Sequence, residues 1–261
     1  MRKILLASVA TVAFATSASA YDLIHPFYGP SEGKITSTTS YDWSANKINE
    51  KGDKDRYHSW GLAEDLAYGI QDNWTAYAGL GMDKSRNRND RHLSKGKDTT
   101  WYLGSSYNII NDGQQFLQVY GGYYQTNAKS RDTYDREQET FRIVDAEVMY
   151  GWNLDYFTPY AIVAWSGDIN NSEDKNGVWN GFVGAYKKLT DKVGATLGVD
   201  YTYATDDSKT KEWDVVAKVG YMLTDKAALE LAGYYMLDES VKHARETDKA
   251  YGLTASVKFE F

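Results

Sequence analysis

The last twelve residues of the chain alternate strictly between apolar and polar or small side chains. Every odd position from 251 onward is apolar: Tyr251, Leu253, Ala255, Val257, Phe259 and Phe261. Successive side chains of a β-strand point to opposite faces, so this period of two indicates a strand with one apolar face. We therefore predict a strand over residues 250–261 whose apolar row includes the final aromatic residue.

The same alternation recurs along the chain, separated by turn signals. We predict strands over residues 34–45, 57–68, 74–83, 99–110, 115–126, 141–152, 157–167, 177–188, 193–204, 212–223, 227–238 and 250–261. Short turns follow the even strands, including Asn111-Asp112-Gly113, which is a hairpin signal. Longer charged runs follow the odd strands. The pattern predicts an all-β fold over residues 34–261, an antiparallel up-and-down β-barrel of about twelve strands.

Two of these strands fit the alternation poorly. Glu64 and Asp65 are adjacent in the second strand, so one of them must face outward unless a bulge intervenes. In the eighth strand, residues 177–188, apolar side chains fall on both faces. The registers of these two strands stay open.

Composition narrows the class of protein. Aromatic residues make up 15% of the chain, with 22 Tyr and 8 Trp, and there is no Cys, so no disulfide can form. The net charge of −7 argues against nucleic acid as a partner, because phosphate binding needs a basic surface. Residues 1–20 have two early cations, an apolar run and the end Ala18-Ser19-Ala20, which predicts a signal peptide cleaved near Ala20.

Together, the signal peptide, the alternating strands, the turn asymmetry and the final Phe resemble Gram-negative outer-membrane β-barrels of the small porin-like kind. The resemblance implies the bacterial outer membrane as the location, with its lipid and lipopolysaccharide as surroundings. It implies that the barrel assembly machinery reads the last strand, through Tyr251, Phe259 and Phe261. Residues 21–33 would then be a periplasmic lead-in, which we prefer, or a segment folded into the barrel mouth.

The polar faces of the strands would line the lumen. The charged residues that we expect there are Asp83, Asp145, Glu147, Asp200, Asp214, Lys218, Glu230, Lys258 and Glu260. Acids predominate, and a negative lumen favours cations. The alternative is that these acids pair with Lys, Arg or Tyr and only stabilise the wall.

Small inward residues would leave room for water. These are Gly79, Gly104, Gly194, Gly198, Gly220 and Gly252, although Tyr77, Tyr102 and Tyr234 could fill the same space. We expect a passive channel for small polar or cationic solutes, with no cofactor, no metal and no enzymatic activity. The alternatives are a non-conducting structural or adhesion barrel, and a hydrolase with Asp238, Glu239 and His243 at its rim. The sequence does not indicate an oligomeric state.

Overall fold

The fold is a single closed barrel of antiparallel strands. The computed structural model describes residues 23–50, 53–88, 93–131, 136–170, 177–205, 209–240 and 249–261; the predicted signal peptide and its cleavage site lie outside them. The strands are β1 (Ile35–Glu50), β2 (Asp53–Gln71), β3 (Trp74–Arg88), β4 (Leu93–Asn111), β5 (Gln115–Arg131), β6 (Arg136–Trp152), β7 (Thr158–Asp168), β8 (Gly177–Lys188), β9 (Val193–Ala204), β10 (Lys211–Thr224), β11 (Ala227–Ser240) and β12 (Lys249–Glu260). The described residues form no helix, and hence none long and apolar enough to cross a membrane.

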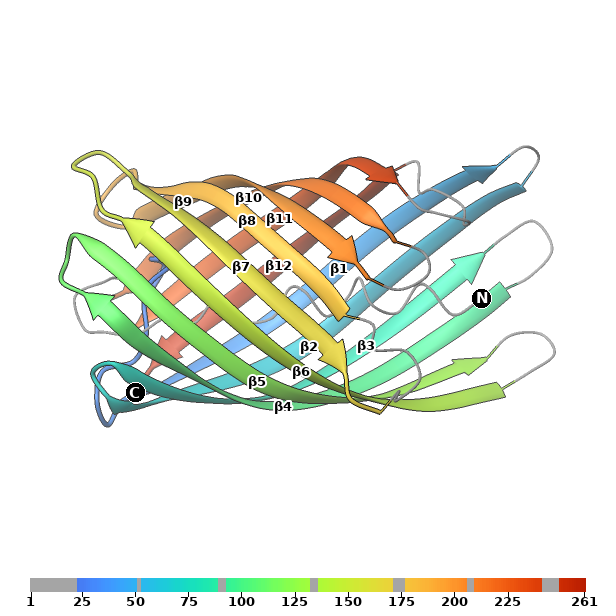
Figure 1. Cartoon of the computed structure of the whole chain (residues 1–261), viewed down its shortest axis with the longest axis horizontal. Coiled ribbons are helices and arrows are strands. Elements are labelled where there is room, and N and C mark those ends of the chain that lie inside the picture. Colours follow the sequence, from blue (N-terminus) through green and yellow to red (C-terminus); the bar gives the residue numbers. More distant parts are fainter. Residues whose placement is uncertain are drawn as a thin grey trace.

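Each strand pairs with its neighbours in sequence, and β1 pairs with β12 to close the ring (Figure 1). Beyond the ladder, Phe261 N–H donates to Ile35 O at 2.8 Å. We call the end that carries the short turns and the C-terminus the turn end, at the left of Figure 1, and the opposite end the loop end. The predicted twelve-stranded up-and-down barrel is confirmed.

Several strands extend further toward the loop end than the sequence predicts. β2 begins at Asp53 rather than 57, β4 begins at Leu93 rather than 99, and β5 ends at Arg131 rather than 126. Much of the charged runs predicted as loops between β1 and β6 is therefore strand. Polar side chains on both faces hide the alternation there, while the backbone pairs continue without a break from Asn127↔Thr140 to Arg131↔Arg136.

The short turns are built by side chains that accept backbone hydrogen bonds. Asp112 Oδ1 accepts from the N–H groups of Gln114 at 2.9 Å and Gln115 at 2.7 Å, and Gly113 has a φ of 84°. These bonds favour the charged carboxylate, so they hold the pKa of Asp112 below its usual range. Thr190 Oγ1 caps its turn in a similar way, accepting from Val193 N–H at 3.0 Å.

The two ambiguous strands have clear registers. In β2, Asp65 points into the barrel, where Tyr102 Oη donates to its Oδ1 at 2.7 Å, and Glu64 points outward with no bulge between them. In β8, Phe182 is buried inside the barrel, whereas Val183 faces outward and is 68% exposed. An inner apolar side chain is stable there because the lumen itself holds an apolar cluster.

The outer wall is an apolar band between two rows of aromatic side chains. The row nearer the loop end contains Trp43, Trp60, Trp101, Trp165, Trp179, Tyr201, Trp213, Tyr235 and Tyr251. The row nearer the turn end contains Tyr68, Trp74, Tyr107, Tyr150, Trp152, Tyr221 and Phe259. Between the rows lie exposed side chains such as Leu80, Leu197 and Leu231. Such a band with aromatic borders is the form of a wall that faces lipid.

Candidate functional site: the barrel lumen

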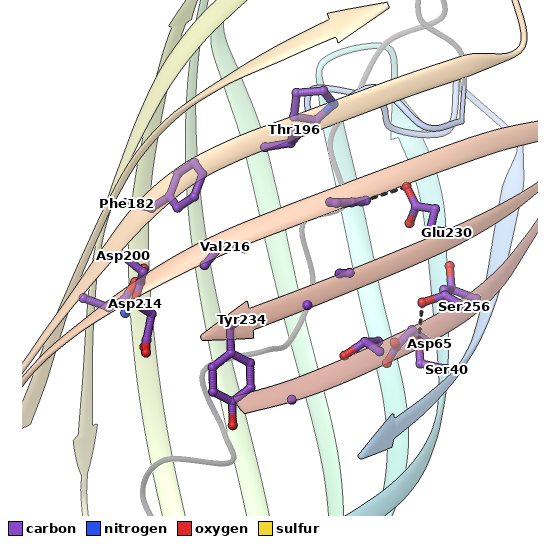
Figure 2. A pocket seen from close by; sticks show the side chains of 18 of the residues that line it. Ser40, Asp65, Phe182, Thr196, Asp200, Asp214, Val216, Glu230, Tyr234 and Ser256 are labelled. Atoms are coloured by element: carbon purple, nitrogen blue, oxygen red, sulfur yellow. Dashed lines mark hydrogen bonds and ion pairs between the residues drawn. The ribbon is translucent and has the colours of Figure 1, made fainter. Parts of the chain in front are cut away.

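A cavity of about 390 Å³ runs along the inner wall (Figure 2). Its lining comes from β1 to β4 and β7 to β12, together with the segment 23–33 that precedes β1. Labelled residues on its wall include Asp200, Asp214 and Tyr234, which project from neighbouring strands into the same space. The lumen is the candidate site because polar and charged side chains converge on it.

Acidic side chains gather in the cavity toward the loop end. Asp214 on β10 is paired in register with Asp200 on β9, and Glu212 is paired with Glu239 on β11. Asn180 Nδ2 donates to Asp200 Oδ2 at 2.7 Å. Asp214 is 8% exposed, and its Oδ1 has no hydrogen-bond partner among the described residues. This face of the lumen therefore carries concentrated negative charge.

More acids face inward on the opposite wall. Asp83 on β3 is paired with Asp98 on β4, and a Cβ on the neighbouring Gly61 would overlap the Asp83 carboxylate. Asp42 on β1 accepts a hydrogen bond from Thr254 Oγ1 at 2.5 Å. Acids thus stand on both sides of the lumen.

The cations at the loop end face the other way. By strand alternation, the outward positions there include Lys47, Arg56, Lys84, Arg86, Arg88, Lys95, Lys97, Lys129, Arg131, Arg142, Lys211 and Lys249. No inward position of the described strands at this end carries Lys or Arg. Acids line the mouth and bases surround it, so the field inside the mouth is negative although the rim as a whole is mixed.

Two lysines enter the lumen nearer the turn end, and both pair with one acid. Lys218 Nζ lies 2.7 Å from Glu230 Oε1, and Lys258 Nζ lies 3.6 Å from Glu230 Oε2. The side chains of Glu230 and Lys258 are 8% and 9% exposed. This triad has one more positive than negative charge, so the inner wall near the turn end contains cations that the acidic part of the lumen lacks.

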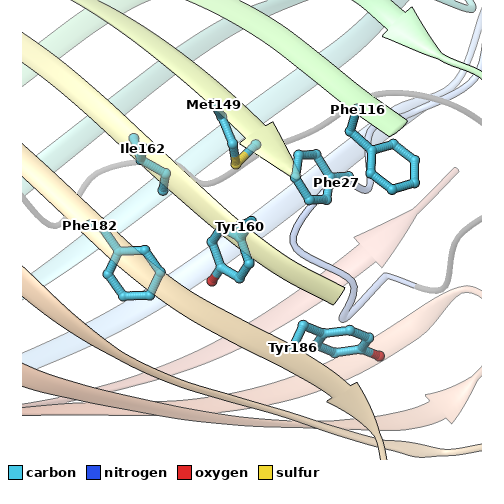
Figure 3. Close-up of a cluster of buried hydrophobic side chains, with 7 residues drawn as sticks. All are labelled: Phe27, Phe116, Met149, Tyr160, Ile162, Phe182 and Tyr186. Atoms are coloured by element: carbon cyan, nitrogen blue, oxygen red, sulfur yellow. The ribbon is translucent and has the colours of Figure 1, made fainter. Parts of the chain in front are cut away.

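Residues 23–33 lie inside the turn end. Leu23, Ile24 and Phe27 are each at most 3% exposed. The Phe27 ring stacks on Phe116 with centroids 4.6 Å apart and meets Tyr160 edge-on at 5.8 Å (Figure 3). The apolar cluster continues through Met149, Ile162, Phe182 and Tyr186. This placement in the barrel mouth replaces the lead-in outside it that we preferred, and apolar burial is its cause.

Polar contacts tie this segment to the closing strand. Tyr28 Oη donates to Glu260 Oε2 at 2.6 Å and lies 3.1 Å from Thr36 Oγ1. Lys258 Nζ donates to Leu23 O at 2.9 Å. Side chains of β1 and β12, the two strands that close the ring, therefore hold the segment by hydrogen bonds.

The inward glycines do not leave open space, and this expectation was wrong. A Cβ on Gly79 would lie 2.1 Å from the Tyr102 ring, and one on Gly252 would lie 2.3 Å from the Tyr234 ring. The remaining glycines are covered in the same way: Gly104 by Tyr120, Gly194 by Tyr186, Gly198 by Phe182 and Gly220 by Ile24. A glycine has no side chain of its own, so a bulky side chain can lie against its backbone. The covering side chains therefore occupy the space that we expected water to fill.

The structure places all nine predicted lumen charges on inward positions, but only some of them line the cavity. Asp200, Asp214, Lys218, Glu230 and Lys258 line the cavity. Asp83 does not border it, and Glu260 is engaged by Tyr28. Asp145 and Glu147 on β6 lie against a tyrosine wall, where Tyr124 hydrogen-bonds to Asp145 and Tyr120 to Tyr124.

Other lining residues were missed by the sequence analysis. Glu212 and Glu239 line the acidic part of the cavity, and Asp65 lies on its far side. Glu212 is an even-numbered residue of the same strand as Asp214 and Lys218, so the alternation of side chains could have identified it as a lumen residue. The inward orientation of Asp65 and Asp42 could be predicted only from the register of the first two strands. The adjacent acid Glu64 made that register ambiguous.

The residues considered for other roles lie apart from this cluster. Tyr251, Phe259 and Phe261 face outward along β12, with 43%, 42% and 66% exposure. Of the possible rim catalytic group, Glu239 lines the lumen, Asp238 pairs with Trp213, and His243 lies outside the described residues. Within the described ranges, no three His, Cys, Asp or Glu side chains are arranged to hold a metal ion.

Comparisons with known proteins show which solved structures have a similar fold. No protein-family model matches the sequence, and no curated protein matches it. An outer membrane channel from Pseudomonas putida F1 superposes with a TM-score of 0.65 at 11% identity, covering 94% of this chain and all of that one. The translocator domain of the autotransporter NalP from Neisseria meningitidis gives 0.62 at 10% identity, covering 87% and 88%.

A third solved structure is the NanC porin, with a TM-score of 0.52 at 10% identity over 85% of this chain and 98% of that one. At such identities the likeness concerns the fold alone. The closed ring, the apolar outer band and these neighbours agree. The chain has the fold of a bacterial outer-membrane β-barrel.

Proposed function

We propose that the protein is a passive channel of the bacterial outer membrane for small polar or cationic solutes. The observation that carries the proposal is the cavity of about 390 Å³ with Asp200, Glu212 and Asp214 on its wall. A narrow, low-dielectric passage lined by one sign of charge concentrates counter-ions within it. Lining acids without matching inward cations at that end therefore favour cation entry.

The proposed orientation puts the turn end in the periplasm and the loop end outside the cell. Short periplasmic turns are the usual arrangement in such barrels. The outward cations at the loop end, such as Arg86 and Lys97, would then face the phosphates of lipopolysaccharide. In this orientation the outward aromatic row of β12, which ends at Phe259 and Phe261, is offered to the barrel assembly machinery.

A non-conducting structural or adhesion barrel is the second candidate. It is favoured by the segment 23–33 inside the turn end and by aromatic rings that fill much of the lumen. A rim hydrolase has less support, because Asp238 and Glu239 belong to different neighbourhoods. We propose no catalytic role.

Single-channel recording separates these possibilities. Purified protein in a planar bilayer should give current steps with a modest preference for cations. The variant Asp200→Asn, Glu212→Gln, Asp214→Asn should keep the steps and lose most of that preference. Glu230 is left intact because it is the shared counter-ion of Lys218 and Lys258.

The matched control is Asp145→Asn, Glu147→Gln, which removes inward acids that do not border the cavity. It should leave ion preference unchanged. Folded protein that gives no steps across a range of voltages and salts, with or without residues 23–30, would support the structural barrel. If the cation preference of the channel is unchanged in the variant without the three cavity acids, the role assigned to these acids is refuted.

A further inference from the structure

The cavity wall near the loop end contains buried oxygen atoms that have no donor. In the part of the chain that the structure describes, Asn46 Oδ1, Asn87 Oδ1 and Asp214 Oδ1 are buried, line the cavity and accept no hydrogen bond. Glu230 Oε1 also lacks a hydrogen bond there, but Lys218 Nζ lies 2.7 Å from it. Burying an acceptor without a donor costs free energy. Three such oxygens on one wall therefore suit a bound group that donates hydrogen bonds.

The strand register places these three residues on one level of the wall. In order from β10 through β12 and β1 to β3, this level contains Asp214, Met236, Ala250, Asn46, Tyr57 and Asn87. Each is the direct cross-strand partner of the next, except that Met236 and Ala250 both adjoin the pair Tyr235↔Tyr251. All six residues line the cavity. We call them the Asp214 level.

Negative charge lies at both ends of the Asp214 level. At one end, Asp214 is paired in register with Asp200 on β9, and like charges directly opposite each other are destabilising. At the other end, Asp83 and Asp98 lie close enough to Tyr57 to interact with it electrostatically. The described strands carry no inward Lys or Arg at this end of the barrel. A bound cation would relieve the repulsion.

The middle of the Asp214 level is apolar. Met236 and Ala250 are each 4% exposed. Tyr234, the preceding inward residue on β11, points into the same space as Asp214 (Figure 2). Thioether and aromatic surfaces attract methylene groups, and a ring face also attracts a cation. The three steps from β10 to β1 correspond to roughly 14 Å of wall, so one small cation cannot contact Asp214 and Asn46 together.

A ligand that matches this level is positively charged, has donors at both ends and is apolar in between. An ammonium group supplies three donors and no acceptor. We propose that the Asp214 level binds a linear organic cation with an amino group at each end, that is, a diamine or a polyamine. This inference rests on the proposed channel function, since it names the class of solute that enters the cavity.

A metal ion matches the level less well. Such an ion gathers several oxygen ligands around a single centre. Within the described ranges, no three His, Cys, Asp or Glu side chains are arranged in that way. Acceptors spread along the wall suit separate donors on a flexible chain.

Titration calorimetry on the folded barrel in detergent micelles tests the ligand class without requiring ion flow. The diamine putrescine should bind about tenfold more tightly than Mg²⁺, which has the same charge. Butylamine, which has the same chain and only one amino group, should also bind about tenfold more weakly than putrescine. Equal affinity for putrescine and Mg²⁺ would show that only the general negative field attracts cations, and would overturn the site.

A neutral variant tests the acceptors apart from the charge. Asn46→Ala with Asn87→Ala removes two carbonyl groups and leaves the net charge unchanged, and it should weaken putrescine binding about tenfold. The matched control is Thr38→Ala with Ser256→Ala, which removes two neutral polar groups from the cavity wall nearer the turn end. It should bind putrescine as the unaltered protein does. Heat-modifiable gel mobility confirms that each variant is folded, and the comparison of putrescine with Mg²⁺ needs no variant.

The outcomes separate this inference from the channel function. Putrescine affinity that is unchanged in the variant without the two Asn side chains would overturn the Asp214 level as the site. Current steps in a planar bilayer without putrescine binding in micelles would support the channel and refute the diamine. Putrescine binding that depends on Asn46 and Asn87, in a barrel that gives no steps, would support the site and refute the channel.

Discussion

Glu230 is the residue on which the charge of the inner wall depends most. It is the shared counter-ion of two lysines, and Lys258 is held where solvent scarcely reaches. Removing one partner of a buried ion pair is much more costly than the net worth of the pair, because the remaining charge is left without compensation. The same lysine also donates to Leu23 O, so a change at Glu230 extends to the segment inside the mouth.

We predict that Glu230→Gln lowers the free energy of unfolding by about 3 kcal/mol, because two ammonium groups lose their counter-ion. Denaturant unfolding in detergent micelles, followed by tryptophan fluorescence, measures it. Glu230→Gln combined with Lys258→Met should recover part of the loss. Asp225→Asn, in an exposed turn, is the control and should be near neutral. A stability of Glu230→Gln equal to that of the control would show that the triad is solvated in practice.

At the scale of elements, the segment 23–33 and the cluster around Phe27 decide how open the turn end is. Four side chains of this segment pack against β5, β7, β10 and β12, and none of these contacts is local in sequence. The segment is held by apolar burial and a few hydrogen bonds rather than by ladder pairing, apart from one isolated bridge, Glu32↔Gly69. It is therefore easier to displace than any strand.

Deleting residues 23–30 should increase the single-channel conductance several-fold without abolishing the barrel, because the strand ladders do not pass through this segment. Bilayer recording gives the conductance, and heat-modifiable mobility confirms the fold. Tyr156→Ala is the control, since Tyr156 is an aromatic residue at the same end but is 81% exposed. An unchanged conductance after the deletion would mean that the current is limited elsewhere in the lumen.

The sequence was informative about elements where the structural rule is local. Alternation within β9, β10 and β12 identified strands to within a residue, and the turn residues around Asp112 and Thr190 marked the hairpins. The segment 23–33 has no periodicity, and its place depends on contacts with residues more than eighty positions away, such as Phe116 and Glu260. Cross-strand pairs of glycine and aromatic residues also require the register, which is why the open space was overestimated.

At the scale of the whole molecule, orientation in the membrane is the property that most needs a direct test. Lys95→Cys, on β4 at the loop end, should react with a membrane-impermeant thiol reagent in intact cells. Asp225→Cys, in the turn between β10 and β11, should react only after the outer membrane is permeabilised. The reverse pattern would invert the orientation. Thr247, another position suitable by sequence, lies outside the described residues.

The contacts that hold the segment 23–33 inside the barrel have a consequence for the order of folding. Its contacts are completed by Lys258 and Glu260, which are synthesised after β1 to β11, whereas the segment itself is synthesised before them. The full set of contacts around the segment 23–33 can therefore form only once β12 is in place. A chain interrupted before β12 would lose the wall and its plug together.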